Sequence, residues 1–136
     1  MPTLLLKVAP LQNPPRYQQL AQALTRLSTV HLHKRAEVTA VLIEDLPAAR
    51  WFVGSQPLQH PTALLEISIT AGTNTSAEKE AFIAAAYAEL EQQLGDGLPL
   101  EEASYVIVRE VEAGDWGYGG VTQGARRKAA PSPVPH

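Results

Sequence analysis

The chain has 136 residues, of which 45% are hydrophobic and 18% charged, and this balance is typical of one ordinary globular domain. A formal net charge of -3 argues against binding to nucleic acid or to an anionic membrane surface. The absence of cysteine excludes disulfides and thiol catalysis and suits a cytoplasmic protein. No apolar stretch approaches the roughly 20 residues that cross a bilayer, and we expect no signal peptide.

The first half of the chain predicts a strand, a helix and a second strand. Residues 3–8 (TLLLKV) form an apolar run of strand length. Asn13 followed by two prolines predicts a helix start, and apolar residues recur behind it at helical spacing until the pattern fades near residue 28. Residues 37–43 (EVTAVLI) are rich in β-branched side chains and predict the second strand.

The second half repeats this order. Residues 63–69 (ALLEISI) predict a strand, and in the turn after it Thr75 and Glu78 have the spacing of a capping box. An apolar helical stripe follows, with Gly95 as its expected stop. Residues 105–108 (YVIV) predict a fourth strand, and the DWGYGG segment beyond it predicts a turn that supports a short hairpin.

The two halves share one sequence frame. Residues 42–55 (LIEDLPAARWFVGS) align with residues 107–120 (IVREVEAGDWGYGG), and the alignment brings both tryptophans, Trp51 and Trp116, into register. Two β-α-β units, each with parallel strands, predict an α+β fold with one four-stranded mixed sheet and both helices on one face. The other face and the edges of the sheet would stay apolar, so we expect oligomerisation.

A Met-Pro start, a short strand, an amphipathic helix, a second strand and a W/F-x-x-G hairpin resemble the tautomerase superfamily, which includes 4-oxalocrotonate tautomerase and macrophage migration inhibitory factor. The resemblance covers about residues 2–125 and is to the fused type, with repeats over about 2–56 and 63–121. It implies a single domain over residues 1–125 and assembly as a homotrimer. The Pro-rich end of the chain predicts a disordered tail over residues 126–136.

The resemblance implies a role for Pro2. In this family the initiator methionine is removed, and the secondary amine of the proline acts as a general base or acid. Burial in a partly apolar pocket would lower the pKa of that amine toward neutrality, where a proton-transfer group is most efficient. If Met1 stayed in place, the nitrogen of Pro2 would be an amide and this chemistry would be lost. Alone, a proline at position 2 is more often incidental, but the duplication favours the catalytic interpretation.

The residues at the family's substrate-binding positions differ from those of 4-oxalocrotonate tautomerase. The arginines of 4-oxalocrotonate tautomerase project onto Gln12, Thr73, Ala40 and Tyr105, none of which is arginine. The pattern of macrophage migration inhibitory factor fits better, because Lys34 matches its active-site lysine. That likeness implies that Lys34 binds a substrate carboxylate, with the neighbouring Arg35 as the substitute.

Three further residues are implied in the pocket. Tyr105 matches the active-site tyrosine of macrophage migration inhibitory factor, which comes from the neighbouring subunit, and Trp116 stands where the family places an aromatic pocket wall. Thr73 lies in the turn after the third strand, where this family often lines its pocket. Because the second repeat starts at the internal Ala63, we expect one active site per chain.

Each of these residues also has a plainer interpretation. Lys34 with Arg35 reads as a pair of solvated cations, Tyr105 as strand core, Trp116 as a packing anchor and Thr73 as part of a turn and helix cap. Arg50 and Arg109 are candidates for the missing arginines, but ion pairs are the simpler expectation for both. His31 and His33 lack a third ligand, so we expect no metal.

The function expected from this resemblance is keto–enol proton transfer on a small carboxylate substrate, with Pro2 as base and acid, no cofactor, and no nucleic-acid or membrane partner. Decarboxylation, or hydration with dehalogenation, is the alternative within the superfamily. Hydration would need a carboxylate to activate water, and Glu37, Asp45 and Glu110 are present without a motif that places them. A non-catalytic trimeric binding or scaffold protein is the alternative outside enzymes, and the missing arginines favour it.

Overall fold

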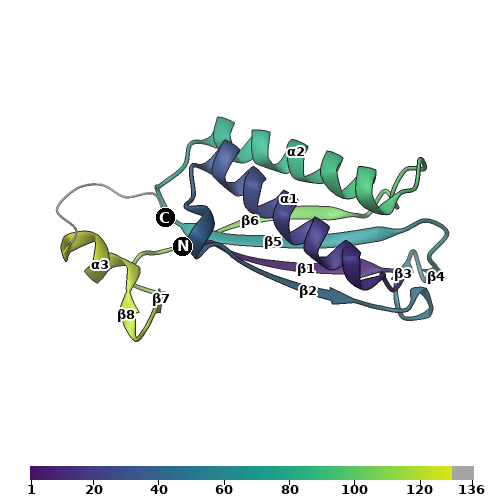
Figure 1. Cartoon of the computed structure of the whole chain (residues 1–136), viewed down its shortest axis with the longest axis horizontal. Coiled ribbons are helices and arrows are strands. Elements are labelled where there is room, and N and C mark those ends of the chain that lie inside the picture. Colours follow the sequence, from purple (N-terminus) through teal and green to yellow (C-terminus); the bar gives the residue numbers. More distant parts are fainter. Residues whose placement is uncertain (130–136) are drawn as a thin grey trace.

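The computed structural model describes residues 1–129, and it is built around a four-stranded mixed sheet in the order β2-β1-β5-β6 (Figure 1). The six main elements are β1 (Thr3–Ala9), α1 (Pro14–Leu32), β2 (Ala40–Asp45), β5 (Thr62–Thr70), α2 (Ser76–Leu94) and β6 (Tyr105–Val111). Strands β1 and β2 are parallel, as are β5 and β6, while β1 and β5 run antiparallel. The α+β fold and the duplicated β-α-β plan are confirmed.

Each repeat ends in a short hairpin. The minor elements are the 3-10 helices η1 (Ala36–Val38) and η2 (Ala48–Arg50), the strand pairs β3 (Phe52–Val53) with β4 (Gln56–Pro57) and β7 (Gly117–Tyr118) with β8 (Val121–Thr122), and α3 (Gln123–Ala129). Because the two repeats are joined antiparallel through β1 and β5, their hairpins lie at opposite ends of the sheet (Figure 1).

The core lies between the sheet and the two long helices, which cover the same face (Figure 1). Alternate side chains of β1 and β5 point into it, among them Leu4, Leu6 and Ile67, which are almost fully buried. Leu24 of α1 and Phe82 of α2 close it from above and have no exposed surface. Burying a side chain of this size contributes roughly 1.5–3 kcal/mol, so this shared layer joins the two repeats into one domain.

The second strand begins later than its sequence pattern predicts. Residues 36–38 form η1, and β2 starts only at Ala40, where the backbone nitrogen donates a hydrogen bond to the carbonyl of Pro2 (3.2 Å). The strand starts there because its partner β1 starts at Thr3, level with Ala40. Before that point no strand is available to pair, and the hydroxyl of Thr39 closes a turn on the carbonyl of Arg35 instead (2.7 Å).

The two long helices differ in the hydrogen bonds and residues that cap their ends. Asn13 is the N-cap of α1, as expected, but its side chain makes no capping hydrogen bond, whereas Thr75 and Glu78 form the predicted capping box of α2. The helix α1 continues past the predicted fading point to Leu32. Gly95 does end α2, in a right-handed conformation. The position requires glycine because a Cβ there would clash with the carbonyl oxygen of Leu98.

The C-terminal part of the described chain is more ordered than expected. Residues 126–129, which the composition assigns to a disordered tail, belong to α3. The helix is tied to the hairpin that precedes it, because the backbone nitrogen of Gln123 donates to the carbonyl of Trp116 (2.9 Å). Residues 130–136 of the predicted tail lie outside the described part of the chain.

The face of the sheet away from the helices is not uniformly apolar. Leu5 and Leu42, which lie side by side on β1 and β2, are 46% and 56% exposed. Glu66 continues this row on β5, and Arg109 lies beside it in an ion pair (3.3 Å). This face therefore offers an apolar surface crossed by charges. Of the helices within residues 1–129, none has the length and apolar character needed to span a membrane.

Candidate active site

The N-terminus lies at the end of the sheet where β2 begins. Pro2 is buried, and its carbonyl accepts the hydrogen bond of Ala40 that starts β2 (3.2 Å). Partial burial, together with the positive charges of Lys34 and Arg35, lowers the pKa of the Met1 amine to about 6. An amine at this position is therefore largely unprotonated at pH 7, which is the state that a base requires.

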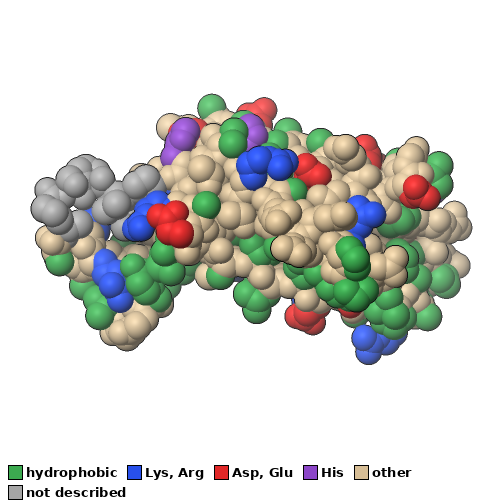
Figure 2. Space-filling view, in the orientation of Figure 1, with side chains coloured by type: hydrophobic (Ala, Val, Ile, Leu, Met, Phe, Trp, Pro, Cys, Tyr) green, Lys and Arg blue, Asp and Glu red, His purple; other side chains and the backbone are tan. Residues whose placement is uncertain are grey.

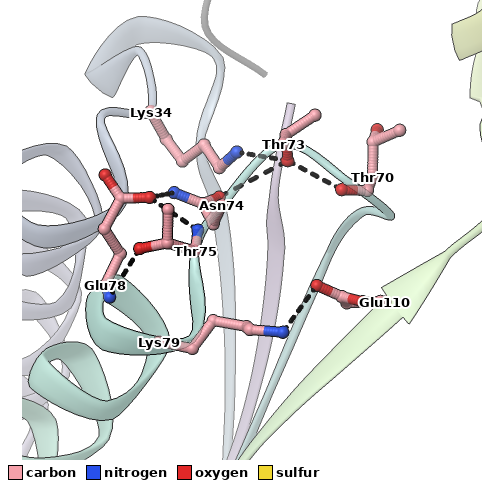
Figure 3. Close-up of polar contacts among 8 residues, drawn as sticks. All are labelled: Lys34, Thr70, Thr73, Asn74, Thr75, Glu78, Lys79 and Glu110. Atoms are coloured by element: carbon pink, nitrogen blue, oxygen red, sulfur yellow. Dashed lines mark hydrogen bonds and ion pairs between the residues drawn. The ribbon is translucent and has the colours of Figure 1, made fainter.

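Lys34 is the buried cation of this end of the molecule. The helix α1 ends at Leu32, and its C-cap His33 has a left-handed backbone (φ 60°), which turns the chain so that the side chain of Lys34 is directed inward. The backbone nitrogen of Lys34 donates to the carbonyl of Ser28 (3.2 Å). Lys34 is 3% exposed, and its Nζ donates a hydrogen bond to Oγ1 of Thr73 (3.1 Å; Figure 3). Burial lowers the pKa of Lys34 to about 8.

The turn between β5 and α2 holds the partner of Lys34 in place. The hydroxyl of Thr73 donates to the carbonyl of Thr70 (2.7 Å), so its oxygen is oriented to accept from Lys34 (Figure 3). Asn74 donates through Nδ2 to the carbonyl of Leu32 (3.0 Å), which joins this turn to the end of α1. The lysine and its acceptor, which are far apart in the chain, are thus positioned by one network.

Glu78 supplies a negative charge that acts on Lys34. It accepts from the backbone nitrogen of Thr75 (2.8 Å) and lies 2.9 Å from Nε2 of His33. The hydrogen bond from the backbone of Thr75, followed by that from Nδ2 of Asn74 (3.3 Å), holds the pKa of Glu78 below its usual value. Its charge favours the protonated form of Lys34 and partly offsets the effect of burial. Lys34 nevertheless forms no direct ion pair with a carboxylate within residues 1–129.

Trp116 lies at the same end as Pro2. Its indole Nε1 donates to the hydroxyl of Thr70 (3.2 Å), and Thr70 is fully buried. The same Thr70 accepts the hydrogen bond of Thr73 through its carbonyl. Lys34, Thr73 and Trp116 are therefore brought together by contacts within one chain. Beside them, Lys79 and Glu110 form an ion pair (2.8 Å; Figure 3) that joins α2 to β6.

Tyr105 lies at the opposite end of the sheet. It is level with Leu64 of β5 and through it with Lys7 of β1, five residues beyond Pro2. That separation is about 17 Å along the strand. Because of this separation Tyr105 cannot reach the Pro2 of its own chain, and its 60% exposed side chain is free to contact another chain. Its role in a pocket shared between subunits stays a prediction.

Arg35 and Arg109 form ion pairs at the surface, whereas Arg50, for which an ion pair was also expected, forms none within residues 1–129. Arg35 is exposed and pairs with Glu37 (2.9 Å), and Arg109 pairs with Glu66 (3.3 Å), so the ion pair expected for Arg109 is present. Arg50 closes η2 in the turn after β2, at the far end from Pro2. No three metal-binding side chains cluster within the described part of the chain.

Sequence reasoning missed one cation of this end. Arg127 of α3 was assigned to the tail, yet its positive charge is among the causes that lower the pKa of Lys34. A signal was present, because Gln123 and Arg127 have the four-residue spacing of one helix face. The Pro-rich residues that follow in the sequence instead favoured the prediction of a disordered tail.

The sequence matches no family model, and no curated protein matches it. Among solved structures, an asymmetric trimer of a fused 4-OT is 25% identical with a TM-score of 0.79, over 91% of this chain and 98% of that one. A native fused 4-OT is 26% identical with a TM-score of 0.76, over 90% and 97% of the two chains. A protein inactivated by 2-oxo-3-pentynoate is 17% identical with a TM-score of 0.79, over 91% and 98%, which is a likeness of fold.

The match to the fused 4-OT structures includes both repeats, because it covers nine-tenths or more of each chain. It agrees with the internal duplication, the sheet order and the hairpin at the end of each repeat. The first of these neighbours is a trimer. The chain belongs to the tautomerase superfamily, in its fused two-repeat type.

Proposed function

We propose that the protein is a tautomerase in which Pro2, freed by removal of Met1, transfers a proton between the oxygen and a carbon of a small keto–enol acid. The observation that carries the proposal is the environment of the N-terminus, where partial burial and the charges of Lys34 and Arg35 lower the pKa of the Met1 amine, one residue before Pro2, to about 6. Such an amine is a base at neutral pH and, once protonated, an acid of matched strength. It removes the proton from the enol oxygen and returns it to the carbon, so the amine is regenerated in each turnover.

The groups around Pro2 suit a carboxylate substrate. The ammonium of Lys34 is buried, has a single hydroxyl partner in Thr73, and lacks a carboxylate partner within residues 1–129. The low dielectric around a buried cation strengthens its attraction for an anion. Trp116 forms an apolar wall beside it. In the homotrimer that we propose, Tyr105 of a neighbouring subunit completes the pocket and supports the negative charge that develops on the enolate oxygen.

Hydration with dehalogenation is less well supported. That reaction needs a carboxylate that is free to activate water. Glu37 is paired with Arg35, and Glu110 with Lys79. Asp45 accepts hydrogen bonds from the backbone of Gln12 (2.7 Å) and from the hydroxyl of Tyr17 (2.6 Å), at the far end of the sheet from Pro2. Glu37 and Glu110 are therefore engaged in ion pairs, and Asp45 is both hydrogen-bonded and far from Pro2.

The test is the ketonisation of phenylenolpyruvate by wild type and by Pro2→Ala, with the intact mass of each sample recorded. We expect wild type to lack Met1 and to be active. Pro2→Ala should lose at least about a hundredfold in kcat/KM, because general acid–base catalysis contributes roughly a hundredfold to ten-thousandfold. A form with an uncleaved N-terminal tag is the matched control, since its Pro2 nitrogen is an amide, and it should be as inactive as the variant.

A second readout does not depend on the choice of substrate. The neighbour inactivated by 2-oxo-3-pentynoate suggests this reagent as a probe. The free amine of Pro2 should add to its triple bond and gain the mass of one reagent molecule, located on the N-terminal peptide. Equal ketonisation rates in all three forms, or a processed wild type that neither reacts nor is labelled at Pro2, would contradict the proposal and favour a non-catalytic binding protein.

A further inference from the structure

The end of α1 and the turn before α2 are joined by an inner hydrogen bond as well as by a surface ion pair. At the surface, Nε2 of His33 lies 2.9 Å from Glu78, and the two side chains are 65% and 29% exposed. Figure 2 shows histidine side chains exposed at this end of the helical layer. Inside, Nδ2 of Asn74 donates to the carbonyl of Leu32, the last residue of α1 (3.0 Å). Because an exposed ion pair contributes little, the bond of Asn74 is the stronger link between the two segments.

The carbonyl of Leu32 depends on this donor. It is among the last four carbonyls of α1, which have no partner within the helix. Leu32 is 1% exposed, so water is almost excluded from it, and a buried carbonyl without a donor destabilises the protein. Asn74 therefore holds the turn after β5 at a fixed place against the end of α1.

The amide of Asn74 can adopt only one orientation. Its Nδ2 donates a second hydrogen bond to Oε1 of Glu78 (3.3 Å), so both of its N–H groups are engaged. The reverse orientation would place Oδ1 against two acceptors, which is unfavourable. Oδ1 therefore faces Thr73, whose Oγ1 lies 3.4 Å away (Figure 3).

Thr73 connects this arrangement to Lys34. Its Oγ1 accepts from Nζ of Lys34 (3.1 Å) and donates to the carbonyl of Thr70 (2.7 Å). Lys34 follows Leu32 by two residues, and Thr73 precedes Asn74 by one. The bond from Asn74 to the end of α1 therefore sets the distance at which Thr73 meets Lys34.

We propose that Asn74 is a positioning residue of the Pro2 site, which fixes the direction of the Lys34 ammonium toward the carboxylate of the substrate. The inference rests on the function proposed above, because it requires Lys34 to bind that carboxylate. A lysine side chain loses much rotamer freedom when it is held in one place. Asn74 imposes this order before the substrate arrives, so the energy of binding does not have to supply it. Its amide acts through Thr73 and Lys34 and needs no contact with the substrate.

The experiment compares two reagents that label Pro2, namely 2-oxo-3-pentynoate and its uncharged methyl ester. In protein that lacks Met1, at neutral pH, the second-order labelling rate of the acid is divided by that of the ester. We expect Asn74→Ala to lower this ratio about tenfold, the effect of weakening a hydrogen bond to a charged group. Partial unfolding would slow both reagents equally, so the ratio responds to recognition of the carboxylate and not to the folded fraction.

Thr75→Ala is the matched control. Thr75 lies in the same turn, and its hydroxyl accepts from the backbone nitrogen of Glu78 (3.1 Å), a capping bond that is separate from the contacts of Asn74. This variant loses a hydrogen bond of similar kind from the same turn. It should nevertheless change the ratio less than about twofold.

A double-mutant cycle tests whether Asn74 acts through Lys34. In Lys34→Ala there is no ammonium left to position, so the addition of Asn74→Ala should change the ratio less than about twofold. Circular dichroism of every variant establishes that the sheet and the helices remain folded.

The outcomes separate this inference from the proposed function. If Pro2 is labelled but the ratio falls equally in Asn74→Ala and Thr75→Ala, falls equally with and without Lys34, or does not fall, the inference is overturned and the tautomerase proposal stands. A folded wild type that neither reagent labels contradicts the tautomerase proposal. The dissociation constant of 2-oxopentanoate, read from chemical shifts, then decides the inference. Weaker binding by Asn74→Ala alone supports it, whereas equal binding by both variants, or none by wild type, overturns it.

Discussion

At the scale of single residues, two pKa values at the Pro2 end lie on either side of neutrality. The pKa of the N-terminal amine is lowered to about 6 and that of Lys34 to about 8, in both cases chiefly by burial. Both groups are cationic acids, so each loses its charge as the pH rises through its pKa. Between the two values the amine is an uncharged base while Lys34 still carries the positive charge that attracts a carboxylate.

This pair predicts a bell-shaped dependence of kcat/KM on pH. With Met1 removed, the amine of Pro2 lies next to the same charges, which should lower its pKa as they lower that of Met1. Activity should therefore rise on the acid side as this amine loses its proton and fall through about pH 8 as Lys34 does. Lys34→Arg is the diagnostic variant, because a guanidinium stays charged to beyond about pH 12 and should remove the alkaline limb. Steady-state kinetics from pH 5 to about pH 10 measure this. An alkaline limb that is unchanged in Lys34→Arg assigns it to another group.

At the scale of elements, the two long helices both begin after a residue type that favours the N-cap, but only one of them is capped by its side chain. Thr75 accepts from the backbone nitrogen of Glu78 (3.1 Å), and the Glu78 side chain accepts from the nitrogen of Thr75 (2.8 Å). Asn13 has the extended backbone of an N-cap but donates and accepts no capping hydrogen bond through its side chain. The proline after Asn13 has no amide hydrogen, which already removes one of the donors that a cap would satisfy.

This contrast predicts unequal costs for two matched substitutions. Thr75→Ala should lower the free energy of unfolding by about 1 kcal/mol, because it leaves a helix donor without its acceptor. Asn13→Ala removes no such bond and should cost no more than a few tenths of a kcal/mol. Urea unfolding of both variants beside wild type, at one protein concentration, makes the comparison. Equal losses would mean that the capping bond of Thr75 contributes nothing to stability.

At the scale of the whole molecule, the outer face of the sheet and the far position of Tyr105 both favour assembly. Leu42 is 56% exposed and lies beside Leu5, on a face that no helix covers. Tyr105 is on the same sheet but about 17 Å along it from Pro2, too far to serve the Pro2 of its own chain. An oligomer that buries this face would bring the tyrosine of one chain toward the proline of another.

We therefore predict that Leu42→Lys disrupts a trimer and lowers activity together. A buried lysine without a partner would cost the interface several kcal/mol. Sedimentation equilibrium should show a trimer for wild type and a smaller species for the variant, with specific activity that recovers at high protein concentration. Val30→Lys is the matched control, since Val30 of α1 is 57% exposed on the helical layer. A wild type that sediments as a monomer, or a Leu42→Lys that stays trimeric, contradicts the prediction.

The sequence by itself determined the duplicated β-α-β plan, the four strands, the capping box at Thr75 and the position of Pro2, because periodicity and capping depend on neighbours in the chain. Only the tertiary structure decided which distant side chains meet. The antiparallel pairing of β1 with β5 sends Tyr105 to the far end of the sheet and brings Thr73 to Lys34, 39 residues away. The late start of β2 and the return of Arg127 on α3 likewise depend on strand pairing and docking, which no local pattern encodes.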